Sequence, residues 1–177
     1  MNKELLEKQL AEFPLYQYMF IDTGELSFSP RVRHICESEC PMYGKSWACP
    51  PAVGSVEDCQ KKCLSYPEAL VITTITEVSD IANLQETLDT RAPHEAITHA
   101  VADLVRRQCG DVYVLSTEAC AICEDCAYPD GPCRHPSRMF PCVESHGILA
   151  TELAEKYGID FIGGNIVTWF SLIFYRD

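Results

Sequence analysis

The sequence predicts an α/β fold, with α+β as the alternative, in which helices pack on a mixed sheet of about four strands. Two observations predict it. Helical and strand-like hydrophobic patterns alternate along the chain, and 177 residues suit a single domain, residues 1–177. A third observation concerns the loops. Eleven residues are cysteine, and most of them fall in two loops at element boundaries, where functional groups usually sit on a rigid scaffold.

Four segments carry helical signals. Leucines spaced along KELLEKQLAEF predict a helix that ends before Pro14. Ser55, followed three residues later by Asp58, resembles a capping box and opens a helix to about Tyr66. A long helical region follows, broken near Pro93 and ended by Gly110, and a last helix is expected over residues 142–157.

Four segments read as strands, at residues 15–23, 68–78, 111–117 and 165–175. The run EALVITTITEV is continuously apolar and β-branched, which predicts a buried strand.

The charge and the chain start exclude several functions. A net charge of −12 argues against nucleic-acid binding, which needs a basic surface. No apolar run approaches the roughly 18 residues of a membrane span. The opening MNKELLEKQLAEF is charged and is not a signal peptide. We therefore expect a cytoplasmic protein, whose cysteines stay reduced and serve metal or redox chemistry rather than disulfides.

The second cysteine loop, CAICEDCAYPDGPCRHP, is the stronger metal signal. Cys120, Cys123 and Cys126 repeat a thiol every third residue, which is the spacing of an iron–sulfur run. A Pro-Asp-Gly-Pro turn lets Cys133 fold back as the fourth ligand. We expect a [4Fe–4S] cluster here.

Zinc is the alternative for this loop. Four-cysteine zinc sites usually pair two separate C-x2-C knuckles, whereas here the third cysteine overlaps the first knuckle. A redox-active dithiol would leave the extra cysteines without a role. The adjacent cations Arg134, His135 and Arg138 could raise a cluster's potential or form a solvated basic patch.

The first loop, CESECPMYGKSWACPP, offers three thiols for a second centre, Cys36, Cys40 and Cys49. Cys59 is the preferred fourth ligand. Cys63 lies one turn further along the same predicted helix, and Cys142 or an open iron position are the other options. Trp47 could shield a cluster or belong to the core, and Cys109 is expected to be a small buried hydrophobe.

Together the two loops resemble a prokaryotic family of predicted metal-binding proteins, a cysteine-rich domain of unknown function. Its C-P-x-Y-G-x-x-W-x-C-P-P pattern matches residues 40–51, and its second motif matches Cys120, Cys123, Cys126, Cys133, Arg134, His135 and Pro136. The resemblance implies metal binding, with iron–sulfur ligation expected, and no established reaction. Cys142 and His146 stand where the family pattern has smaller residues.

Three functions remain open. The leading one is electron transfer with a protein redox partner through one or two [4Fe–4S] clusters. The second is an enzyme that uses an open three-cysteine cluster. The third is a zinc-stabilised interaction module. The ligands predicted for both centres are Cys36, Cys40, Cys49, Cys59, Cys120, Cys123, Cys126 and Cys133.

Overall fold

The computed structural model describes residues 1–176, and one four-stranded sheet organises them. The strands lie in the order β1–β2–β4–β3, with bounds β1 (Gln17–Asp22), β2 (Glu68–Glu77), β3 (Asp111–Leu115) and β4 (Ile166–Arg176). The α-helices of this part of the chain are α1 (Lys3–Leu10), α2 (Pro30–Ser38), α3 (Val56–Leu64), α4 (Leu84–Asp89), α5 (Arg91–Cys109) and α6 (Ala150–Tyr157). Two 3-10 turns, η1 (Thr23–Glu25) and η2 (Glu144–His146), complete the fold.

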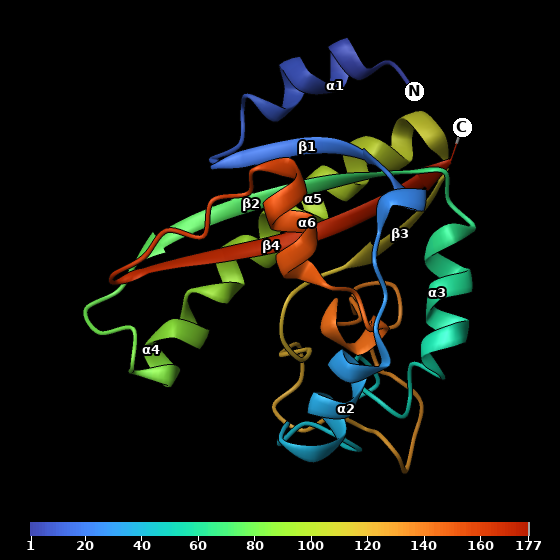
Figure 1. The fold of residues 1–177 in the computed structure, drawn as a ribbon, viewed down its shortest axis with the longest axis vertical. Coiled ribbons are helices and arrows are strands. Elements are labelled where there is room, and N and C mark those ends of the chain that lie inside the picture. Colours follow the sequence, from blue (N-terminus) through green and yellow to red (C-terminus); the bar gives the residue numbers. More distant parts are fainter. Residues whose placement is uncertain (177) are drawn as a thin grey trace.

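Helices cover both faces of the sheet. In Figure 1, α5 runs behind the sheet and α6 lies in front of it. Ala69 and Val71 of β2 pack with α3 and α6, whereas Leu70 and Ile72 pack with α1 and α5. This alternation follows from the two-residue period of a strand. It confirms the prediction that this segment is a buried strand.

The prediction of four strands with packed helices is confirmed, but the pairing is not mixed. All three strand pairs are antiparallel. Alternating helices and strands are typical of sheets with parallel crossovers. The direction of each pair depends on which strands are neighbours, and the sequence does not show this.

Three local predictions need correction. Helix α2 occupies residues expected to be loop, and its signals are Ser29, which caps it, and Pro30 in its first turn. The long helical region breaks at Thr90, and Pro93 lies in the first turn of α5, where a missing N–H does little harm. The helix expected over residues 142–157 is interrupted by Gly147.

Gly147 has a structural reason to be glycine. Its φ is +73°, and a Cβ there would lie 3.1 Å from the Ser29 carbonyl oxygen and 3.0 Å from a Val56 methyl. Its carbonyl also accepts a hydrogen bond from the Ser29 N–H at 2.7 Å. The turn therefore joins η2 to the start of α2.

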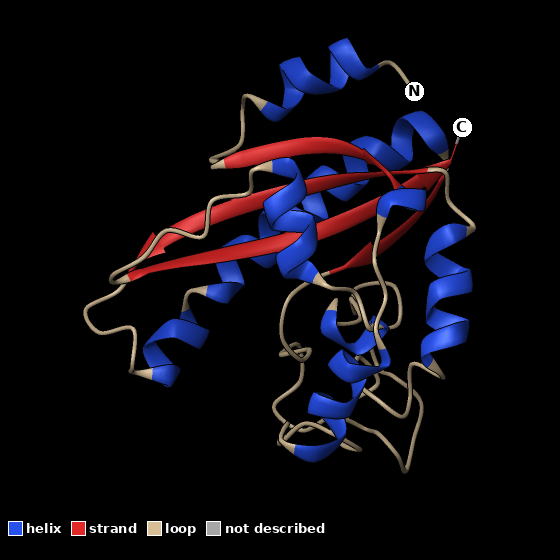
Figure 2. Ribbon diagram, viewed as in Figure 1, coloured by secondary structure: helices blue, strands red, loops and turns tan. Residues whose placement is uncertain are grey.

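The two cysteine loops lie together beyond one edge of the sheet. In Figure 2 the long tan segments collect below the strands, around α2. No helix within residues 1–176 is long and apolar enough to cross a membrane.

Candidate metal centre

The four cysteines of the second loop line one pocket. Cys120, Cys123, Cys126 and Cys133 are all half-buried around it. Ser46 and Trp47 of the first loop form part of the wall, and Arg134 and His135 lie at its rim. The structure thus brings together the four ligands predicted for this loop and adds neighbours from the other loop.

One cysteine of the pocket, Cys126, is stabilised as the thiolate. Burial acts to raise the pKa of Cys126, but hydrogen bonds from the Tyr128 and Trp47 backbone and from the Ser46 hydroxyl outweigh it, so the pKa is lowered. Burial raises the pKa of Cys120, and a hydrogen bond from the Ile122 backbone opposes this rise. A thiolate is the form that binds a metal, so the donor set fits a thiolate-ligated metal group.

The three cysteines of the first loop are electrostatic neighbours. Cys36 ends up on α2 rather than in a loop. Burial raises the pKa of Cys36, and the neighbouring thiol of Cys40 raises it further. Burial likewise raises the pKa of Cys49 to about 12, followed by the effect of Cys40 and, more weakly, of Cys36 and Cys120. Three thiols that oppose one another's ionisation are stabilised when a cation binds among them.

Cys142 lies beside this group. Its main-chain N–H donates to the Ala48 carbonyl at 3.2 Å, next to Cys49. Its thiol donates to the Glu144 carboxylate at 2.7 Å. Burial raises the pKa of Cys142, with Glu144 the next cause and Cys49 a further one. Cys142 was one of the options for the fourth ligand of the first centre.

Cys59, the preferred fourth ligand, has different neighbours. Its thiol lies 3.6 Å from an Arg33 guanidinium nitrogen and 3.4 Å from the Val53 carbonyl oxygen. Cys63, one turn along α3, belongs to the core beneath the sheet. Burial raises the pKa of Cys63 to about 12, and Cys59 adds to this effect. The predicted role of Cys59 as a ligand therefore stays a prediction.

Cys109 lies away from both cysteine loops, in the helical core. Cys109 packs against the core formed by α1, α5 and the sheet, consistent with its predicted apolar role. None of the cysteines within residues 1–176 forms a disulfide. No three Cys, His, Asp or Glu side chains in that range lie at the spacing of a single-ion site.

The two loops are joined by direct contacts. The Trp47 indole N–H donates to the Gly131 carbonyl at 2.9 Å, and its ring meets the Tyr128 ring edge-on at 5.0 Å. The Cys142 N–H, at the end of the second loop, donates to the Ala48 carbonyl of the first loop at 3.2 Å. Trp47 therefore holds the first loop against the pocket of the second loop.

Comparison with known families agrees with this arrangement. A family model described as predicted metal-binding protein (DUF2284) matches residues 19–175. The chain belongs to this family. Searches of the curated proteins and of the solved structures found no match. The family model thus covers nearly the whole chain, including both cysteine loops. Its description specifies metal binding and no particular metal or reaction.

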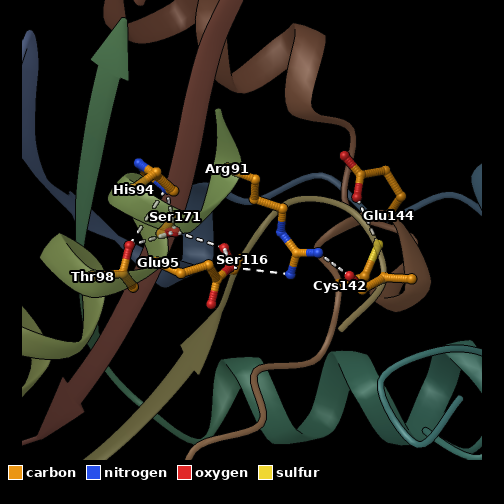
Figure 3. Close-up of polar contacts among 9 residues, drawn as sticks. Arg91, His94, Glu95, Thr98, Ser116, Cys142, Glu144 and Ser171 are labelled. Atoms are coloured by element: carbon orange, nitrogen blue, oxygen red, sulfur yellow. Dashed lines mark hydrogen bonds and ion pairs between the residues drawn. The ribbon is translucent and has the colours of Figure 1, made fainter. Parts of the chain in front are cut away.

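A set of polar residues behind the loops of this DUF2284 member was not predicted from the sequence. A buried chain of side chains runs from the sheet to the second loop, and Figure 3 shows most of it. Its members are Thr74, Arg91, His94, Glu95, Thr98, Ser116 and Ser171. The sequence signal was slight, since Arg91 and Glu95 read only as an ion pair one helical turn apart.

Proposed function

We propose that the protein is an iron–sulfur protein that transfers single electrons to or from a protein partner. The observation that carries the proposal is the pocket in which Cys120, Cys123, Cys126 and Cys133 converge. Their period of three along the chain is the pattern of iron–sulfur ligation. A [4Fe–4S] cluster bound there would supply one-electron redox chemistry at low potential.

The chain's own residues support such a group. The Ser46 hydroxyl and the backbone of Trp47 and Tyr128 provide hydrogen bonds to the Cys126 sulfur. Trp47 also lines the pocket with aromatic surface and packs edge-on against Tyr128. Both effects, hydrogen bonds to sulfur and exclusion of water, are levers that set the potential of a bound cluster.

The first loop supports a second centre on Cys36, Cys40 and Cys49, with Cys59 or Cys142 as the fourth thiolate. Cys120 is close enough to Cys49 to contribute to the raised pKa of the Cys49 thiol. Two redox groups held on adjoining loops could exchange electrons directly, which suits an electron carrier.

The partner is proposed from charge. The net charge of −12 favours a protein partner with a basic docking surface. We place the protein in the cytoplasm, because a reducing compartment keeps so many thiols available for metal binding.

An enzyme with an incomplete first centre is the second candidate. The Cys142–Glu144 hydrogen bond favours it, because it places a proton donor beside Cys49. In that case the fourth position on the first centre would accept a small Lewis-basic molecule. A zinc-stabilised interaction module is the third candidate.

Metal analysis tests these functions. Protein purified without oxygen is assayed for iron, acid-labile sulfide and zinc, with an optical spectrum. About eight iron and eight sulfide per chain indicate two cubanes, and about four of each indicate one. Cys126→Ala and Cys49→Ala then assign the iron to one loop or the other, and Cys109→Ala, in the helical core, is the matched control. Stoichiometric zinc without sulfide would overturn the electron-transfer proposal in favour of the third candidate.

A further inference from the structure

Arg91 is a buried cation at the edge of the second cysteine loop. It is only 6% exposed. Its guanidinium donates to the Ala119 carbonyl, directly before Cys120, and to the Glu95 carboxylate at 3.2 Å. Its Nε has no hydrogen-bond partner within the described chain although it is buried. A buried charge with an unused donor is costly unless it serves a neighbouring anion.

The partner of Arg91 is itself held firmly. Glu95 accepts a hydrogen bond of 2.5 Å from the Ser116 hydroxyl, and Ser116 accepts one of 3.1 Å from Ser171. Ser171 lies 2.8 Å from the imidazole Nε2 of His94. These contacts come from α5, from β4 and from Ser116 directly after β3, so the position of the ion pair depends on the body of the fold rather than on the loop.

The cation lies at the start of the Cys120 loop and also near Cys142 and Glu144 (Figure 3). In Figure 3 the Arg91 guanidinium is flanked by Glu95 and Ser116 on one side and by Cys142 and Glu144 on the other. The guanidinium donates to the Ala119 carbonyl, one residue before Cys120, and the Glu95 carboxylate bonds the same guanidinium. Arg91 and Glu95 therefore act on the same centre with opposite signs.

We propose that Arg91 tunes the redox centre of the Cys120 loop, raising its reduction potential, and that Glu95 positions Arg91 and partly offsets its charge. The inference rests on the proposed iron–sulfur function. Adding one electron from a low-potential reductant such as dithionite makes the centre one charge more negative. A fixed cation nearby stabilises that reduced form, and low dielectric around a buried charge strengthens the effect.

The test is a redox titration of the loaded protein without oxygen, followed by electron paramagnetic resonance. Arg91→Gln removes the charge while keeping an amide donor. We expect the ratio of reduced to oxidised centre at a fixed solution potential to fall at least tenfold, which is about 59 mV for a one-electron couple. Glu95→Gln should raise the same ratio, because Arg91 then acts without its counter-charge.

A matched control separates a buried from an exposed charge. Arg134 lies at the rim of the same pocket, is exposed, and bonds the Asp125 carbonyl at 2.7 Å. Arg134→Gln should shift the potential less, and the shift should shrink in high salt, because salt screens exposed charges more than buried ones. The Arg91→Gln shift should persist in high salt.

The outcomes are distinct. Wild-type protein without iron and sulfide would end the proposed function before any variant is made. Loaded wild type with an Arg91→Gln potential equal to its own would overturn the role of Arg91 alone. Where Arg91→Gln fails to fold or load, Glu95→Gln and Arg91→Lys decide. Arg91→Lys keeps the positive charge and should stay near the wild-type potential. An unchanged or lowered potential in Glu95→Gln, together with a tenfold or larger fall of the ratio in Arg91→Lys, would also overturn the proposal.

Discussion

The thiol of Cys142 donates a hydrogen bond to the Glu144 carboxylate at 2.7 Å. Both residues belong to the segment that closes the second loop, yet the Cys142 N–H is bonded to Ala48 of the first. Cys142 is therefore held beside Cys49, whereas Cys59 is held by Arg33 and the Val53 carbonyl.

This difference predicts which cysteine completes the first centre. We expect Cys142→Ser to lose up to about half of the bound iron and sulfide of a two-cluster protein, because it removes a thiolate next to Cys49. Cys59→Ser should retain wild-type loading. The measurement is iron and sulfide content after anaerobic purification. The reverse pattern would restore Cys59 as the ligand.

The position of Trp47 predicts an optical signal for loading. The chain has two tryptophans. Trp47 lines the cysteine pocket, whereas Trp169 is buried in a separate cluster and its indole N–H donates to Thr90 at 2.8 Å. A coloured cluster accepts excitation energy most efficiently from the nearest indole, so loading should quench mainly Trp47.

Fluorescence of two variants checks this expectation. Trp47→Phe should lose most of the quenching that accompanies reconstitution with iron and sulfide. Trp169→Phe, the matched control, should keep it. Equal quenching in the two variants would place the bound group elsewhere.

Burial of His94 predicts a pH-dependent stability. Burial lowers the pKa of His94 to about 4, from an ordinary value near 6.5. Between these values the unfolded chain binds the proton and the folded chain does not, so the free energy of unfolding decreases as the pH falls from 6.5 towards 4. The full effect is about 3 kcal/mol.

Chemical denaturation across this pH range measures the effect. His94→Gln should lower the unfolding free energy at pH 7, because its contacts with Thr74 and Ser171 change, and should flatten the decline at low pH. His34→Gln, which removes an exposed imidazole from α2, is the control and should keep the wild-type slope. An unchanged slope in His94→Gln would contradict the assignment.

Local signals predicted much of the fold. Ser55 does accept a hydrogen bond from the Asp58 N–H at 3.1 Å, so the capping box was read correctly. Gly110 and Gly158 end their helices with positive φ, at +81° and +64°. These features depend on residues within one or two helical turns, so they can be predicted from a short segment of sequence.

Two helix boundaries differ from the prediction, for different reasons. Ser29 and Pro30 are local signals for the start of α2, although most of this segment was expected to be loop. The break at Gly147 depends on the close approach of Ser29 and Val56, which lie far away along the chain.

The sequence by itself determined the strands, most helices and the four cysteines of the second loop, because each rests on spacing within a short segment. Only the tertiary structure decided the antiparallel pairing, the place of Cys142 beside Cys49, and the buried Arg91 with its unused donor. These depend on which distant segments meet. Spacing along a chain carries no distance between segments until the hydrophobic faces of the sheet and helices have packed.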